Sequence, residues 1–351
     1  MKRVLVVLCI VLVFLSACST EQNSIGDSGE IPSNPCGDGV CDNTEQQSSG
    51  CPVDCSSEDS SGDGTPVVPA KDSSSDQWWP DSQGAWSGNL ILATSNDGMT
   101  FTQGERLIEY GGVPNLLYTS QGELIATYQY FSREDESLYD VIAYSVSTDG
   151  GKTWTDPERI NFEGLPDATV GNKQGLFVTH AVDPTLVETS EGSLRLYFTY
   201  QEPENGEPHL ASALASDGDI SSTFVYEEGE RPILDDSPML DPAVVSFNGL
   251  WHHYSWSMDS DSNYHSTSED GVNFELQDNI ELPMDFLGEV IAADGGLRFY
   301  GSGQGGVVSA FSEDGYTWEM EDGSRIQGAD PGVAQLSDGS YIMLYTSMNF
   351  N

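Results

Sequence analysis

Acidic side chains recur in this sequence at the start of similar segments, usually directly before a proline. The segments are "VDPTLVETSEGSLRLYFTY" from Val182, "LDPAVVSFNGLWHHYSWS" from Leu240 and "ADPGVAQLSDGSYIMLYTS" from Ala329, and a shorter copy, "GEVIAADGGLRFYGSG", begins at Gly288. Crowded carboxylates suit general acid–base chemistry, because crowding raises the pKa of some and leaves others ionised. The candidate catalytic residues are Asp183, Asp241, Glu289 and Asp330.

Polar and aromatic residues near these acids are candidates for ligand binding. Arg195 and Arg298 occupy matched places in "LRLYF" and "LRFYG", and His252 and His253 lie in the equivalent part of a third segment. At most one of the two histidines would face a cavity, because side chains alternate along a strand. Each candidate has a structural alternative: aspartates cap backbone amides, arginines pair with acids and aromatic residues fill cores. The candidate binding residues are His180, Arg195, His252, Trp256 and Arg298.

The segments that carry these residues are predicted to be β-strands. From Trp86 onward the chain is rich in Val, Tyr, Phe, Trp and Thr, and no long helical period interrupts it. Short turn signals separate the strands: "STDGGKTW" from Ser147 fits the Asp-box pattern, and "SNDGMTF" from Ser95, "SEDGVNF" from Ser268 and "SEDGYTW" from Ser312 are shortened relatives. Asp and Gly suit tight turns, so we expect a structural role for these aspartates.

One repeat therefore comprises four strands, which is the composition of a propeller blade. The last repeat, from Asp330 to Met348, lacks its hairpin, whereas the first segment, from Gly88, has a hairpin without a preceding Asp-Pro strand. The two halves complete one blade, which removes open sheet edges. We predict an all-β, five-bladed β-propeller over residues 81–351, closed by pairing of its N- and C-terminal strands. The innermost strands would gather their carboxylates in a central pocket.

The N-terminal residues predict export and anchoring. Residues 1–17 combine a basic start with a short apolar run, which is typical of a signal peptide. The sequence "LSAC" resembles a bacterial lipobox, which implies cleavage before Cys18 and its lipidation; an uncleaved anchor or an ordinary signal peptide is the alternative. Residues 18–80 are rich in Ser, Asp, Gly and Pro and predict a flexible acidic tether. The expected location is the bacterial cell envelope or surface, with a lipid anchor in the membrane.

A cysteine-rich module occupies residues 36–55 of the tether. An even set of cysteines in an exported chain predicts disulfides, with their pairing left open. These cysteines are Cys36, Cys41, Cys51 and Cys55. Asp38 and Asp42 offer the oxygen ligands that Ca²⁺ prefers, so calcium is the candidate metal, and a spacer pinned by disulfides is the alternative. No cofactor is expected to be required.

The charge balance excludes one class of partner. The chain has 57 acidic and 12 basic residues and a formal net charge of −45. Such a surface repels phosphate groups, which argues against nucleic acid as a partner.

The Asp-Pro strand heads, the "LRLYF" and "LRFYG" strands and the degenerate Asp boxes together resemble the five-bladed glycoside hydrolase propellers. That superfamily includes the family 43, family 32 and family 130 branches, and proteins with Asp boxes are often labelled sialidase-like. The resemblance implies a carbohydrate partner and two carboxylates across a glycosidic bond, one charged and one protonated. By position it gives Asp183 the role of pKa tuner and makes Asp241 or Glu289 the acid.

The sequence departs from that family at the first strand head. Val113-Pro114-Asn115 stands where the resemblance implies an aspartate base, and Asn cannot abstract a proton. Asp330 or Asp167 could substitute for it. The sialidase branch lacks support, because no Arg-Ile-Pro segment is present. Three functions therefore stay open: a glycoside-acting enzyme, a carbohydrate-binding or protein-recognition propeller without catalysis, and a scaffold.

Overall fold

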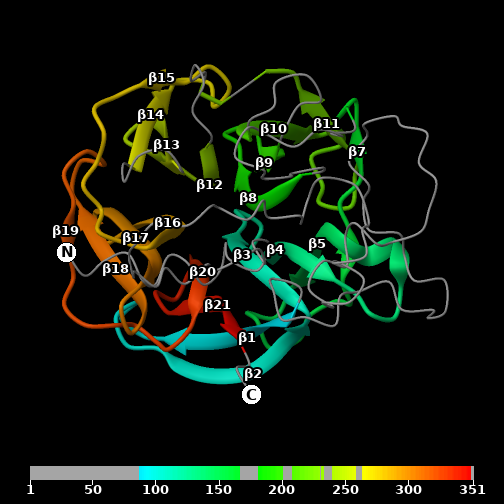
Figure 1. Ribbon diagram of the computed structural model, residues 1–351, viewed down its shortest axis with the longest axis horizontal. Coiled ribbons are helices and arrows are strands. Elements are labelled where there is room, and N and C mark those ends of the chain that lie inside the picture. The colour runs from blue at the N-terminus through cyan, green and yellow to red at the C-terminus, as the bar shows by residue number, and fades with distance from the viewer. Residues whose placement is uncertain are drawn as a thin grey trace, which may run out of the picture. The chain divides into compact units, whose positions relative to one another are not determined.

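The protein is an all-β, five-bladed β-propeller, as the sequence predicts. The computed structural model describes residues 87–166, 181–200, 208–229, 231–232, 239–257 and 263–348. They form five sheets that stand around a central axis (Figure 1). Within these ranges, no helix is both long enough and apolar enough to cross a membrane.

Four blades each use strands that follow one another in the chain, listed here from the axis outward. Blade I contains β3 (Gly111–Tyr118), β4 (Leu124–Phe131), β5 (Tyr139–Ser147) and β6 (Glu158–Arg159), with the short 3-10 turn η3 (Glu136–Leu138) before β5. Blade II contains β8 (Val182–Glu188), β9 (Leu194–Tyr200), β10 (His209–Ala215) and β11 (Phe224–Glu227), and β7 (Phe162–Glu163) is added outside β11. Blade III contains β12 (Met239–Phe247), β13 (Leu250–Ser257), β14 (Asn263–Ser268) and β15 (Glu275–Leu276). Blade IV contains β16 (Phe286–Ala293), β17 (Gly296–Gly303), β18 (Gly306–Ser312) and β19 (Glu319–Met320).

Blade V is built from both ends of the described chain and closes the ring. Its strands from the axis outward are β20 (Ala329–Gln335), β21 (Tyr341–Met348), β1 (Gly88–Ser95) and β2 (Thr102–Glu109). β1 pairs antiparallel with β21 along its whole length, with Leu92 opposite Leu344, and the two strands lie side by side in Figure 1. This pairing confirms the predicted closure. Without it, β1 and β21 would each be an unpaired edge strand.

A β-bulge interrupts the innermost strand of every blade near its start. The pairing shifts by one residue after Gly112, Val182, Leu240, Leu287 and Ala329 in β3, β8, β12, β16 and β20. In four of these strands the residue before a proline adopts a left-handed backbone: φ is 47° at Val113, 53° at Asp183, 55° at Asp241 and 46° at Asp330. Asp tolerates this region better than most residues, whereas a β-branched Val is strained there.

Glycine replaces this proline in β16 because the ring is crowded at that point. A Cβ atom on Gly288 would lie 2.8 Å from Cδ of Pro331 in the neighbouring blade. Any larger residue would therefore force blades IV and V apart.

The Ser-x-Asp segments form tight turns between the third and fourth strands of a blade. In blade I, Ser147 Oγ donates to Asp149 Oδ1 at 2.9 Å, and the same oxygen accepts the backbone N–H groups of Lys152 and Thr153. Bonds from the Thr153 hydroxyl and N–H lower the pKa of Asp149 to about 2. Equivalent bonds hold Asp97, Asp270 and Asp314 in their own turns. These carboxylates thus form hydrogen bonds within the turns that they stabilise.

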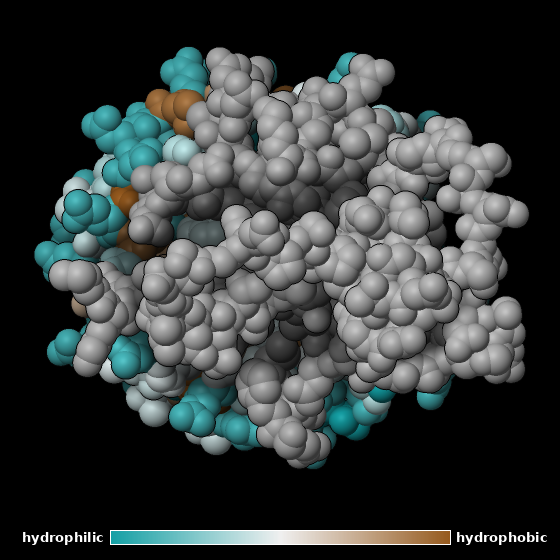
Figure 2. Space-filling model, viewed as in Figure 1, coloured by the Kyte–Doolittle hydropathy of each residue, from teal (hydrophilic) through white to brown (hydrophobic). Residues whose placement is uncertain are grey.

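The described residues that are visible at the rim of the view in Figure 2 are mostly hydrophilic. Among the described residues, few large apolar side chains are exposed, namely Val225, Leu276, Tyr316 and Met320. Apolar residues instead fill the spaces within and between blades, where Leu90, Leu116 and Leu344 belong to one buried cluster.

We predict that Leu344→Ala lowers the free energy of unfolding by about 3 kcal/mol, because it leaves a cavity in the sheet that closes the ring. Leu344 is completely buried. Val225→Ala is the control, because Val225 is 41% exposed, and a change of roughly 0.5 kcal/mol or less is expected there. Urea unfolding followed by tryptophan fluorescence measures both. Equal losses in the two variants would contradict a stabilising role for the closure.

Candidate functional site

A small cavity lies on the axis where the innermost strands begin. Its volume is about 20 Å³, which is room for about one water molecule. It is lined by Val113, Pro114, Asn115, Asp183, Pro184, Thr185, Asp241, Pro242, Leu287, Gly288, Glu289 and Asp330. We call it the hub cavity. The structure therefore brings all four candidate catalytic acids around one space.

The left-handed bulges direct three aspartates to the hub cavity. Asp183, Asp241 and Asp330 each precede a proline at the bulge, and a bulge re-aims the side chain of the residue at which it occurs. All three are half-buried. The same ring position is filled by Val113 in blade I and Leu287 in blade IV, so the aspartates come from blades II, III and V.

Mutual repulsion and burial change the protonation of this cluster. Burial, and then the charges of Asp183 and Asp330, raise the pKa of Asp241 well above its ordinary value. Burial also raises the pKa of Asp330, although the hydrogen bond from the Ser302 hydroxyl opposes this effect. Asp241 therefore retains its proton to a higher pH than an isolated aspartate does. A neutral carboxylic acid beside a carboxylate is the pair that general acid–base chemistry requires.

Glu289 lies one level deeper than the aspartates. It follows the bulge of β16, in register with Asn115, Thr185, Ala243 and Gly332 of the other blades. We call this ring of five residues the polar belt. Sequence comparison alone placed Glu289 at a strand head, but Leu287 fills that position.

Hydrogen bonds across the polar belt tie the blades together. Asn115 Nδ2 and the Leu116 N–H, at 3.3 Å, both donate to Glu289 Oε2. Asn115 Oδ1 in turn accepts the Leu186 N–H at 2.9 Å, and Thr185 Oγ1 donates to the carbonyl of Pro242. Glu289 is only 5% exposed, and burial raises its pKa well above the ordinary value despite these bonds.

Asn115, two positions after the Val113 that holds the place of the expected first-blade aspartate, has an identifiable role. Asn115 offers both a donor and an acceptor, and it bonds to blades II and IV at once. An aspartate could not donate to Glu289. Sequence reasoning missed this role, because the partners lie 174 and 71 positions away along the chain.

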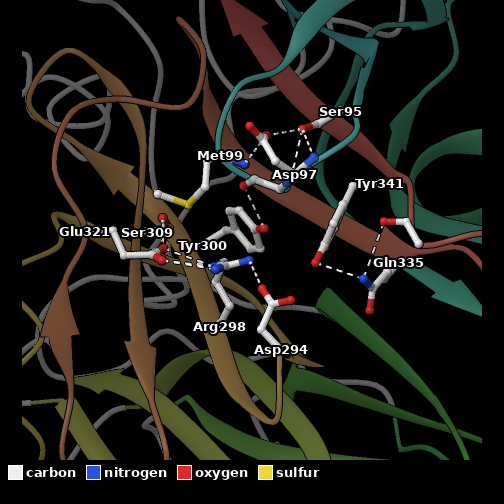
Figure 3. Close-up of polar contacts among 12 residues, drawn as sticks. Ser95, Asp97, Met99, Asp294, Arg298, Tyr300, Ser309, Glu321, Gln335 and Tyr341 are labelled. Atoms are coloured by element: carbon white, nitrogen blue, oxygen red, sulfur yellow. Dashed lines mark hydrogen bonds and ion pairs between the residues drawn. The ribbon is translucent and has the colours of Figure 1, made fainter.

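Arg195 and Arg298 lie away from the hub cavity and are not among its lining residues. Arg298 forms ion pairs with Glu321 at 3.1 Å and Asp294 at 2.9 Å (Figure 3). Arg195 pairs with Glu227 at 3.0 Å. Glu227 and Glu321 also accept bonds from serines on the third strand of the same blade. Both arginines are therefore joined to the outer part of their own blades.

Tyrosines two positions after these arginines fasten each blade to the next one. The Tyr300 hydroxyl donates to the carbonyl of Gly98 in blade V at 2.9 Å (Figure 3), and the Tyr197 hydroxyl donates to Gly271 in blade III at 2.6 Å. Arg195 Nη1 adds a bond to the Asp270 carbonyl in the same turn. We call these contacts the turn clamps, because each one is a hydrogen bond to a backbone carbonyl of a Ser-x-Asp-Gly turn.

In blade III, His252 takes the place of the arginine, two positions before the tyrosine that forms the turn clamp. Its Nδ1 lies 3.0 Å from Nε2 of His265, and the Tyr254 hydroxyl donates to the carbonyl of Gly315 in blade IV at 2.8 Å. A Cβ atom on Gly315 would lie 2.8 Å from the His252 ring, so only glycine permits this approach. Burial lowers the pKa of His252, and burial followed by the charge of His252 lowers that of His265 to about 3.

Trp256 also packs between blades rather than in the hub cavity. Its ring lies 5.8 Å from that of Phe286, and it packs against the core cluster that contains Tyr254 and Phe299. The structure therefore does not bring Arg195, His252, Trp256 or Arg298 to the cavity with the acids.

Several predicted sites fall outside the described residues and stay predictions. They are His180, Asp167, Cys18, the cysteines Cys36, Cys41, Cys51 and Cys55, and the candidate calcium ligands Asp38 and Asp42. Within the part of the chain that the structure describes, no group of three or more His, Cys, Asp or Glu residues is arranged to hold a metal ion.

Known structures share this fold. A protein of unknown function from Dyadobacter fermentans is 15% identical, with a TM-score of 0.51 over 74% of this chain and 84% of its own. A family 117 glycoside hydrolase from Zobellia galactanivorans is 12% identical, with a TM-score of 0.47 over 76% of this chain and 92% of its own. A GH43_1 enzyme from Xanthomonas citri, solved with xylotriose, is 12% identical, with a TM-score of 0.49 over 67% and 80%.

At these identities the likeness concerns the fold alone. No family model matches the sequence, and no curated protein matches it. The chemistry of the site therefore has to come from the residues of this chain.

We predict that Arg298→Gln lowers the free energy of unfolding by about 3 kcal/mol, because it leaves Glu321 without its buried partner. The Arg298 side chain is 8% exposed. Arg106→Gln is the control: Arg106 pairs with Glu109 while 50% exposed, and a loss below about 1 kcal/mol is expected. Chemical denaturation measures both, and similar losses would contradict a stabilising role for the buried Arg298–Glu321 ion pair.

We also predict an unusual pH dependence for the Asp cluster. The pKa of Asp241 is raised in the folded state, so the unfolded chain releases this proton at a lower pH than the folded protein does. The free energy of unfolding therefore falls as the pH rises from 3.8, the ordinary pKa of aspartate, toward the pKa of Asp241 in the folded state. Asp241→Asn should remove this part of the fall, so the variant gains stability over the wild type as the pH increases. Denaturation between acidic and neutral pH tests this.

The exposed Asp217→Asn variant is the control for charge removal alone. It should follow the wild-type profile. A constant difference between Asp241→Asn and the wild type at every pH would show that the Asp241 pKa is not raised.

Proposed function

We propose that the propeller is a carbohydrate-active protein of the glycoside hydrolase type, with the Asp cluster at the hub as its reactive centre. The observation that carries this proposal is the convergence of three aspartates from three blades on one cavity. Asp241, whose pKa is raised by burial and then by the charges of Asp183 and Asp330, is the general acid. Asp183 and Asp330 are the candidates for the ionised partner. This division supplies the charged and protonated carboxyl groups that glycosidic bond cleavage needs.

The size of the hub cavity determines how a sugar would approach. A space of about 20 Å³ takes one water and not a sugar ring. The sugar therefore binds above the half-buried aspartates, with its hydroxyl groups directed at their oxygens. Glu289 lies below that level and is bonded to Asn115, so its place is in the polar belt rather than against the substrate.

Carbohydrate binding without turnover is the second candidate function. The position of the first-blade aspartate is held by Val113, and Asn115 is engaged with Glu289 and Leu186. If no other group can act as base, the cluster still binds sugar hydroxyl groups through charge-assisted hydrogen bonds. We further propose that Cys18 and the tether at residues 18–80 hold either activity at the bacterial cell envelope.

A glycan array and a hydrolysis screen, run on the same protein, test the proposed function. For an enzyme, Asp241→Asn should reduce the release of sugar by about 100-fold or more while glycan binding persists, because it removes a general acid. Asp183→Asn tests the ionised partner in the same assay. The exposed Asp217→Asn variant should keep full activity.

The outcomes separate the candidates. Glycan binding that Asp183→Asn weakens, with no sugar released by the wild type, identifies a binding protein. If the wild type neither binds nor cleaves any glycan, the carbohydrate proposal is wrong.

A further inference from the structure

A second and larger cavity opens at the opposite end of the axis from the Asp cluster. Its volume is about 270 Å³, which approaches the size of small-molecule sites. It is lined by the later residues of all five innermost strands, including Tyr118, Glu188 and Gln335, where β3, β8 and β20 end. We call it the axial funnel. The polar belt separates it from the hub cavity.

The inner walls of the axial funnel are aliphatic, and the polar side chains of its lining lie at its outer end; these belong to Tyr118, Glu188, Ser246, Trp251 and Gln335. The ring of residues directly beyond the polar belt consists of Leu116, Leu186, Val244, Val290 and Val333. These side chains offer no hydrogen bonds. A sugar placed there would leave hydroxyl groups unpaired, which costs about 1–3 kcal/mol for each group. The inner part of this cavity therefore suits an apolar group better than a carbohydrate.

Glu289 forms the inner end of the funnel. It lines both the funnel and the hub cavity, and it is 5% exposed. Its Oε2 atom is fixed by Asn115 and by the Leu116 N–H, so the carboxyl group is held in place at the end of an apolar space.

The charges around the funnel are of one sign. The described residues that line it include Glu188 and Glu289 but no Lys, Arg or His. The whole chain adds a net charge of −45. Apolar walls around a single sign of charge concentrate the potential and attract the opposite ion. The negative potential therefore disfavours an anionic ligand. A cation with an apolar body fits both the aliphatic inner walls and the Glu289 carboxyl group at the inner end.

We propose that the axial funnel binds a small organic cation with an aliphatic body, such as a primary alkylammonium ion. Its ammonium group donates to the carboxylate of Glu289, and its chain lies along the Leu and Val walls. This inference is independent of the carbohydrate proposal, because it concerns the other end of the ring and shares none of the three aspartates.

Proton release accompanies this binding. Burial raises the pKa of Glu289, so its carboxyl group keeps its proton to a higher pH in the free protein than an ordinary glutamate does. An ammonium ion stabilises the carboxylate, and the proton leaves to the buffer. The other titratable groups that line the funnel are Glu188, which accepts two bonds from Ser120, and Tyr118, which donates to Ser337.

Isothermal titration calorimetry of the full chain with n-hexylammonium chloride tests the proposal. The n-hexylammonium ion should bind about tenfold more tightly than 1-hexanol, because only the cation makes a charge-assisted bond. Repeating the titration in buffers of different ionisation enthalpy should reveal proton release, which rises toward one proton per ligand as the pH is lowered below the Glu289 pKa of the free protein.

Three variants locate the site. Glu289→Gln should reduce n-hexylammonium affinity to that of 1-hexanol, whereas the matched control Glu313→Gln, on an exposed turn, should leave it unchanged. Ala292→Trp, which fills the funnel from an exposed position in its lining, should abolish binding of both probes without disturbing the polar belt.

The same titrations can overturn the proposal. Absence of n-hexylammonium binding, equal affinity for the two probes, or undiminished binding by Ala292→Trp would each do so. If Glu289→Gln unfolds the chain, the Ala292→Trp result and the proton count decide instead. Loss of glycan binding has no bearing on these readouts, so failure here is distinct from failure of the proposed function.

Discussion

The β-bulge at the start of each innermost strand, left-handed in four of the five, is the constraint on which the centre of this propeller depends. A regular strand would alternate its side chains between the two faces of a blade. The extra residue instead turns one side chain per blade toward the axis, and it is followed by proline in four blades and by the crowded Gly288 in blade IV. The chemistry of the hub then depends on which residue occupies the bulge. Three blades place Asp there, and blades I and IV place Val113 and Leu287.

The polar belt below the bulges both joins the blades and divides the axis. Asn115 bonds to Glu289 on one side and to the Leu186 N–H on the other, so that blades IV, I and II are linked near the axis. The small residues Ala243 and Gly332 complete the ring, and a Cβ on Gly332 would lie 2.6 Å from the Pro114 carbonyl. Because the belt is packed this closely, it leaves a water-sized hub cavity above and an aliphatic funnel below. The two spaces favour ligands of different chemistry.

Farther from the axis, hydrogen bonds from tyrosines join neighbouring blades. Tyr197, Tyr254 and Tyr300 each bond to the glycine carbonyl of a turn in the next blade. The turn is shaped by its own Ser and Asp, and its glycine leaves room for the clamp. The Ser-x-Asp-Gly turn of one blade and the tyrosine on the second strand of the blade before it are therefore the two partners of one inter-blade contact, which recurs between blades II and III, III and IV, and IV and V. The arginines within that strand stabilise the outer blade through Glu227 and Glu321.

The sequence by itself determined the strand pattern, the number of blades and the closure, because these depend on local periodicity and on matching half-repeats at the two ends. It also selected Asp183, Asp241 and Asp330, since Asp-Pro is a local signal. It could not determine the role of Arg195, Arg298 or His252, because an arginine two residues before a tyrosine has the same spacing whether it faces the axis or the next blade. Only the tertiary structure decided that Glu289 lies one level below the aspartates and that Asn115 is its partner. Those facts depend on a one-residue register shift and on contacts between blades that are far apart in the chain, and neither leaves a local signal in the sequence.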